Sequence, residues 1–159
     1  MTIQIRFILA ACLFLLTGPV FAQTANYKCM IQMISYQGEK AYVVISLINP
    51  KGEYEKTLSM RGPDKQWYNT LKDWHKFQTE TKAKISAITG ASVGGGDRAV
   101  VTVEIDKAKI DAGYTLRFES AVEEQNYHVK DVEVPLTAAG LAAKTDGKGY
   151  IKYVRFSSN

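Results

Sequence analysis

The sequence predicts a mostly β protein, an immunoglobulin-like two-sheet sandwich with one amphipathic helix packed on it. Short segments in which apolar and polar residues alternate recur along the chain after residue 22, and turn residues separate them at regular intervals. About seven such segments are typical of two sheets packed face to face. One segment near the middle departs from this pattern, because its large apolar residues recur at helical spacing.

The first half of the chain contains three predicted strands. Residues 27–33 and 41–48 are separated by turn residues at 37–40, and this pattern predicts a β-hairpin. Residues 49–52 (Asn-Pro-Lys-Gly) predict a tight turn, since proline presets its backbone angle and glycine tolerates a positive one. The third predicted strand follows at residues 54–60.

Four more strands are predicted in the second half. The strand that begins at Tyr114 alternates most cleanly between apolar and polar residues. Asp131 and Glu133, on the strand after it, are interpreted as a solvent-exposed face, and Pro135 ends the pairing of that strand. The four predicted strands are residues 99–105, 114–123, 127–134 and 149–156.

The helical segment lies between these two groups of strands. Four large apolar residues follow Asp64, which is placed to cap a helix, and they predict about three helical turns lying against the sandwich. The two tryptophans among them are interpreted as core packing rather than ligand contacts. A later stretch, residues 136–146, is rich in alanine and glycine and is predicted as a loop with a short helix. The four apolar residues are Trp67, Leu71, Trp74 and Phe77.

Residues 1–22 predict a cleaved export signal. An arginine and the amino terminus supply positive charge, an apolar run follows at residues 7–16, and residues 20–22 (Val-Phe-Ala) have the pattern that a signal peptidase cuts. The run is shorter than the roughly 20 residues that span a bilayer, so a membrane anchor is the weaker alternative. Residues 9–12 (Leu-Ala-Ala-Cys) leave a lipid-modified cysteine open as a second alternative. We therefore expect a periplasmic protein in which residues 23–159 form a single domain.

Several function classes are excluded by composition. Removal of the signal leaves Cys29 as the only thiol, so no internal disulfide is expected. The formal net charge of +4 comes from scattered residues without a basic stripe, so nucleic acid is not an expected partner. No later segment is apolar enough for an integral membrane protein. His75 and His128 lie far apart and no nucleophile–base set is recognisable, so neither a metal site nor catalytic residues are predicted, and the chain is not expected to be an enzyme.

Residues 86–92 (Ser-Ala-Ile-Thr-Gly-Ala-Ser) combine hydroxyl groups with very small neighbours. From composition alone this is an ordinary turn, or a loop whose small side chains let another protein's active site close over it and whose amides cradle an anion. The segment resembles the Asp-x-x-Ser/Thr-Gly-Ala-Thr/Ser signature at which flavin transferases attach flavin mononucleotide (FMN) to exported redox proteins. The resemblance implies a phosphoester at the last hydroxyl. The matching cofactor-binding residues are Thr89, Gly90, Ala91 and Ser92.

The chain departs from this signature at its two ends. The leading acid is replaced by Ser86, and the usual final threonine is replaced by Ser92. The missing carboxylate is expected to weaken recognition by a flavin transferase. If flavin is attached, the side chains expected beside its ring or phosphate are Trp67 or Trp74 and Arg98 or Lys84.

The wider chain, from Tyr27 to Val134, resembles the predicted periplasmic proteins of domain of unknown function family 2271. The resemblance is strongest over residues 67–74, the Thr-Gly-Ala-Ser segment and residues 112–114. It implies a sandwich fold, and together with the flavin signature it implies covalently bound FMN in extracytoplasmic electron transfer, with a flavin transferase and a membrane redox protein as partners. A cofactor-free immunoglobulin-like module for binding or assembly in the cell envelope stays open as the alternative.

Overall fold

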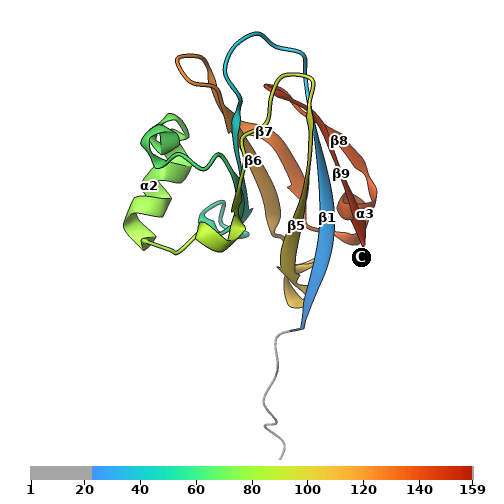
Figure 1. The fold of residues 1–159 in the computed structure, drawn as a ribbon. Helices are drawn as coiled ribbons and strands as arrows, with labels where there is room; N and C mark the ends of the chain where they lie inside the picture. The colour runs from blue at the N-terminus through green and yellow to red at the C-terminus, as the bar shows by residue number, and fades with distance from the viewer. Residues whose placement is uncertain (1–22, 159) are drawn as a thin grey trace, which may run out of the picture.

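The computed structural model of the protein describes residues 23–158. The predicted export signal lies outside these described residues. Within these residues, nine strands form a four-stranded and a five-stranded sheet that pack face to face (Figure 1). The prediction of a mostly β, two-sheet sandwich is confirmed. None of the helices in the described part of the chain is long and apolar enough to cross a membrane.

Strand pairing is antiparallel except between β3 and β4, which run parallel over two residue pairs. In order across the four-stranded sheet, the strands are β5 (Arg98–Asp106), β1 (Thr24–Met33), β9 (Ile151–Ser158) and β8 (Lys144–Asp146). In order across the five-stranded sheet, they are β4 (Thr89–Gly90), β3 (Tyr54–Arg61), β2 (Tyr42–Ile48), β6 (Thr115–Ala121) and β7 (Tyr127–Pro135).

The predicted hairpin of residues 27–33 and 41–48 is wrong. β1 pairs with β5 and β9, whereas β2 pairs with β3 and β6, so the connection at residues 34–41 crosses from one sheet to the other. The alternation of apolar residues had specified which face of each strand is buried, but it carries no information about the partner strand. The turn predicted at residues 49–52 is confirmed, and it joins β2 to β3 with a positive φ of 85° at Gly52.

The main core lies between the two sheets and contains apolar side chains from both. Every second residue of β5 is buried there, including Val101, Val103 and Ile105, as predicted. Cys29 of β1 is a free thiol and is also fully buried in this core, where it packs as a small apolar side chain.

A helical layer covers the outer face of the five-stranded sheet (Figure 1). The predicted single helix consists of two pieces, the 3-10 helix η1 (Lys65–Thr70) and the α-helix α2 (Lys72–Thr81). Between them, Leu71 is fully buried but has non-helical backbone angles (φ −88°, ψ 66°). Asp64 caps η1 as predicted, because its side chain accepts a hydrogen bond from the backbone N–H of Gln66 at 3.1 Å.

The core role predicted for the tryptophans is confirmed. Trp74 is fully buried, and its indole N–H donates to the Thr57 hydroxyl at 2.9 Å. Its ring also meets the ring of Tyr68 edge to face, with 5.2 Å between centroids. Trp74 belongs to a second apolar cluster, between the helical layer and the five-stranded sheet. Trp67 is half-buried and packs at the margin of this second cluster. Because the cluster lies on the far side of β2 and β3 from the main core, the five-stranded sheet is buried on both faces.

The interpretation of Asp131 as solvent-exposed is wrong. Asp131 is fully buried, and its carboxylate accepts hydrogen bonds from the Ser120 hydroxyl and from the backbone N–H groups of Gly149 (2.7 Å) and Ile151 (2.9 Å). The carboxylate therefore fixes the turn that precedes β9. The loop predicted at residues 136–146 contains the short helix α3 (Ala138–Ala142) and also β8, which was not predicted.

Candidate functional site

The segment that resembles the flavin signature forms a surface loop between α2 and β5, residues 85–93, here called the motif loop. Helix α2 ends because Lys82 takes a left-handed conformation (φ 50°). The motif loop then begins at Ile85, which is buried, and continues as the 3-10 turn η2 (Ser86–Ile88) and the short strand β4. Its apolar anchor and its strand pairing hold the loop against the edge of the five-stranded sheet.

Hydrogen bonds fix both ends of the motif loop. At the first end, the Thr89 hydroxyl donates to the Ile85 carbonyl at 2.8 Å, and Thr89 pairs with Met60 of β3. At the other end, Val93 exchanges two backbone hydrogen bonds with Ala41 at 2.8 and 3.0 Å. Between these anchors, Ala91 is exposed and Ser92 is half-buried. The last hydroxyl of the predicted signature is therefore presented on a short, well-anchored segment.

Arg61 lies directly against the glycine of the signature. A Cβ atom at position 90 would stand 2.0 Å from Nη1 of Arg61, so Gly90 leaves room for the guanidinium at this position. The Nε atom of Arg61 is buried without a hydrogen-bond partner, and Arg61 forms no ion pair within residues 23–158. The structure thus places an uncompensated positive charge beside the motif loop. Sequence analysis missed Arg61, because it lies on a different strand, 29 residues before Gly90 in the numbering.

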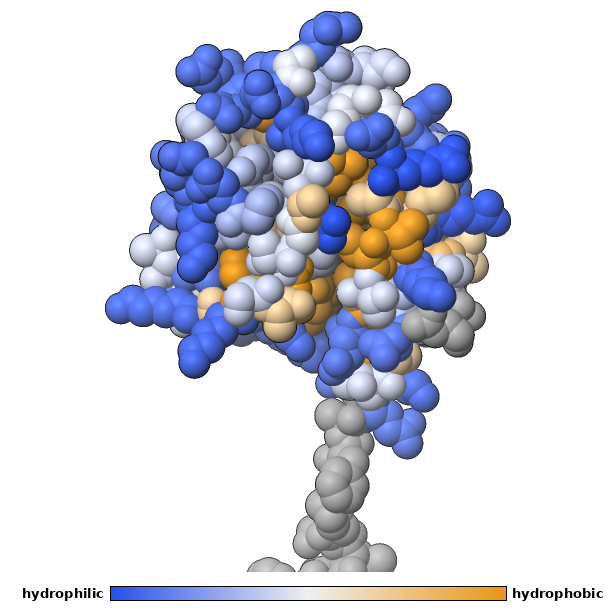
Figure 2. All heavy atoms as spheres, viewed as in Figure 1, coloured by the Kyte–Doolittle hydropathy of each residue, from blue (hydrophilic) through white to orange (hydrophobic). Residues whose placement is uncertain are grey.

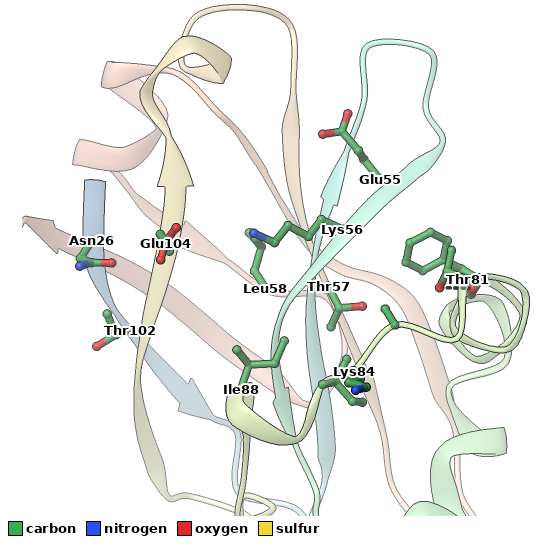
Figure 3. Close-up of a pocket in the computed structure, with 13 residues that line it drawn as sticks. Asn26, Glu55, Lys56, Thr57, Leu58, Thr81, Lys84, Ile88, Thr102 and Glu104 are labelled. Carbon is green, nitrogen blue, oxygen red and sulfur yellow. Dashed lines mark hydrogen bonds between the residues drawn. The ribbon is translucent and has the colours of Figure 1, made fainter. Parts of the chain in front are cut away.

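The motif loop separates two open grooves, and Lys84 and Ile85 line both of them. The first, here called the edge groove, has a volume of about 430 Å³ and lies between β3 and β5. Figure 3 shows Lys56 and Leu58 on one side of the edge groove and Thr102 and Glu104 on the other. Leu58, Ile85 and Ile88 give this groove an apolar floor.

The second groove, here called the helix groove, has a volume of about 650 Å³ and lies between the motif loop, η1 and α2. Thr89 brings the signature to this groove, whereas Ser92 lines neither groove. Burial raises the pKa of the Tyr68 hydroxyl, so this group stays protonated at neutral pH and can donate a hydrogen bond. Gln78 donates from its Nε2 to the Ala83 carbonyl at 2.6 Å, and its buried Oε1 has no donor within the described chain.

The side chains predicted to lie beside a flavin differ in their burial and in their contacts. Trp74 is fully buried, so the expectation that it could pack against a flavin ring is wrong. Arg98 lies at the start of β5, where its Nε donates to the side-chain oxygen of Gln32. Lys84 is exposed and lines both grooves beside the motif loop. The structure therefore gathers Lys84 and the unpredicted Arg61 around the signature.

A buried carboxylate lies beneath the helical layer, apart from both grooves. Glu119 of β6 is fully buried, and its two oxygens accept hydrogen bonds from the hydroxyls of Tyr54 (2.6 Å) and Tyr127. Desolvation raises the pKa of Glu119 to about 7, because it outweighs the two tyrosine hydrogen bonds and the nearby charge of Arg117. The Tyr127 hydroxyl also accepts from the backbone N–H of Asp73 at 3.1 Å, so the network ties the start of α2 to the sheet.

Within residues 23–158, no cluster of three or more histidine, cysteine or acidic side chains is arranged to hold a metal ion. The site therefore consists of a hydroxyl-bearing loop, two cations and two grooves, without a recognisable metal centre in the described part of the chain.

A family model described as "Predicted periplasmic protein (DUF2271)" matches residues 24–153. The chain belongs to this family. Membership in DUF2271 confirms the family resemblance of the wider chain and places the protein in the periplasm, in agreement with the predicted export signal. No curated protein and no solved structure matches the chain. The family description names no cofactor, so the chemistry of the motif loop has to be argued from the loop itself.

Proposed function

We propose that this DUF2271 protein carries FMN joined through a phosphoester to the Ser92 hydroxyl and acts in extracytoplasmic electron transfer. The observation that carries the proposal is the combination of a half-exposed Ser92, at the last position of the signature, with the uncompensated guanidinium of Arg61 beside Gly90. The phosphoester keeps a negative charge, which a neighbouring cation stabilises.

The shape of the motif loop supports enzymatic modification. Its residues around Ser92 are small, Ala91 is exposed, and glycines follow at positions 94–96. A transferase can therefore close over the hydroxyl without meeting large side chains. Because hydrogen bonds hold the loop on both sides of Ser92, the attached group would have a defined starting point on the protein surface.

The attachment step needs FAD as the donor and a flavin transferase as the partner. The Ser92 oxygen forms a bond to the flavin-side phosphorus of FAD, the pyrophosphate P–O bond breaks, and AMP leaves. The hydroxyl proton passes to a base of the transferase, and no electrons are exchanged in this step. Once attached, the flavin supplies the redox chemistry, and the chain holds it for exchange with a membrane redox protein.

The proposal is tested by exporting the protein in cells that contain a flavin transferase and measuring its intact mass. We expect the added mass of one FMN group in the wild-type protein and in Ser92→Thr, which keeps a hydroxyl. Ser92→Ala should remain unmodified. Ser86→Asp restores the acid of the signature and should increase the modified fraction. An unmodified wild-type protein under these conditions, or a modified Ser92→Ala, would contradict the proposal.

The open edge groove favours the second candidate function, a cofactor-free module for binding or assembly in the cell envelope. Such a module needs an accessible surface, and an apolar floor between two strand edges supplies one. This function predicts a colourless protein that crosslinks to an envelope partner equally well with and without the Ser92 hydroxyl. Loss of that crosslink in Ser92→Ala would argue against it.

A further inference from the structure

Within residues 23–158, β5 presents a long strand edge without a partner. It is the last strand of the four-stranded sheet, so only its β1 side is paired. Its register with β1 is regular over nine residue pairs, without a bulge. Proteins usually protect such edges with proline, a bulge or an inward-pointing charge, because unpaired N–H and C=O groups invite pairing with another strand. β5 contains no proline, and its inward-facing residues are apolar.

The other sheet edges in the described chain are protected. β3 has two register irregularities, and β4 covers its last two residues. β7 has a register irregularity with β6 and ends in Pro135, and β8 is only three residues long. β5 is therefore the one long, regular edge within residues 23–158.

The free edge of β5 is also accessible. Thr102 and Glu104 line the edge groove, which keeps this side of the strand open (Figure 3). Two large apolar side chains in the described chain are exposed. Val100 is the more exposed of the two, at 62%. Figure 2 shows hydrophobic surface in the area where β5 and β1 run in Figure 1. Pairing of the free edge with another strand would cover part of this apolar surface.

The charges of β5 are arranged so that the strand complements itself when it runs antiparallel to a copy. With Thr102 opposite Thr102 of the copy, Arg98 at one end of β5 faces Asp106 at the other end of the copy's β5. Glu104 of the copy is then the diagonal neighbour of Arg98. In this register no two like charges of β5 face each other, and Arg98 of each copy meets Asp106 of the other. None of these three charged residues forms an ion pair within the described chain.

We propose that two copies of this protein associate through antiparallel pairing of their β5 strands, with Thr102 at the two-fold axis. The pairing joins the two four-stranded sheets into one continuous sheet and satisfies the open edge of each. A second copy is the partner that the strand itself specifies, since the same residues supply both halves of each charge pair. Such an interface is isologous and closes after two subunits.

Charge reversal tests the pairing in the exported protein by sedimentation equilibrium. Arg98→Asp places two acids opposite each other at both ends of the interface and should raise the dissociation constant of the dimer by about tenfold or more. Asp106→Arg should weaken the dimer similarly. The double variant, with both substitutions, restores opposite charges and should recover most of the affinity. Thermal melting of each variant checks that it is folded, because Asp106 also caps the turn after β5 at Ala108.

A cysteine placed at the axis gives an independent measurement. Thr102→Cys should form a disulfide-linked dimer under mild oxidation, because directly opposite residues of antiparallel strands lie within disulfide reach. Arg155→Cys is the matched control: it is exposed in the same sheet but two strands away, and it should not link. A wild-type monomer at all accessible concentrations, or a dimer that neither charge reversal weakens, would overturn the proposal. An extended peptide captured by a monomeric protein would also overturn it.

Discussion

Glu119 is a carboxyl group that the fold keeps fully away from water, between two tyrosine hydroxyls. Its folded-state pKa is raised to about 7 from an ordinary value of 4.5. Between these two values the folded protein binds a proton that the unfolded chain has released. The free energy of unfolding therefore falls as the pH rises through this window, and the loss is complete above about pH 7.

Replacement of Glu119 by Gln should remove this pH dependence. The amide keeps the shape of the carboxyl group and can still accept from one tyrosine and donate to the other. The free energy of unfolding of Glu119→Gln, minus that of the wild type, should therefore increase by about 3 kcal/mol between pH 4.5 and pH 8. Urea unfolding at both pH values measures the difference.

Glu80→Gln is the matched control for this experiment, because Glu80 lies exposed on α2. It should keep the pH dependence of the wild type, since its carboxyl group stays in water in both states. If Glu119→Gln kept the same pH dependence as well, the pKa of Glu119 would not be raised in the folded protein.

The attachment of α2 to the sheet depends on one tryptophan more than on the other. Trp74 is fully buried and donates to the Thr57 hydroxyl, whereas Trp67 is half-buried. Trp74→Phe should cost roughly 2 to 3 kcal/mol of unfolding free energy, because it removes buried volume and leaves the hydroxyl without its donor. Trp67→Phe should cost less than about 1 kcal/mol. Urea unfolding and amide exchange in α2 test the pair, and equal costs would contradict the assignment.

Most elements could be predicted from hydrophobic periodicity, and the failures have local causes. The periodicity of Trp67 to Phe77 predicted the helical layer, but a break at Leu71 is compatible with the same spacing of apolar residues. The wrong hairpin of residues 27–33 and 41–48 arose because alternation identifies a buried face and not a partner strand. Asp131 was misinterpreted because its hydrogen-bond donors lie 11 to 20 residues away in the sequence, beyond any local pattern.

The candidate site could be predicted only as far as it is contiguous in sequence. The motif loop was found because its hydroxyls and glycine lie within seven residues, 86–92. Arg61 and the two grooves were not found, because parallel pairing of β3 with β4 and the packing of α2 bring them to the loop. Likewise, the self-complementary charges of β5 become meaningful only once the structure shows that its second edge has no partner.

The two clusters of apolar side chains meet in β2, whose seven residues are all buried. Val43 and Ile45 belong to the core between the sheets, while Val44 packs under the helical layer. A strand that is shared in this way couples the two layers, so we expect them to unfold as one cooperative unit. Loss of the helical layer should then expose the main core as well.

The thiol of Cys29 reports on that coupling, because it is fully buried in the main core and burial raises its pKa. In the folded protein a thiol reagent should label it only through unfolding, at a rate set by the unfolding equilibrium. Trp74→Phe lies in the other cluster. The substitution should nevertheless lower the free energy of opening measured by Cys29 labelling. The decrease should equal the loss of unfolding free energy measured in urea. Labelling is followed by mass spectrometry of the peptide that contains Cys29. If Cys29 stayed fully protected in this variant, the helical layer would open independently of the sandwich.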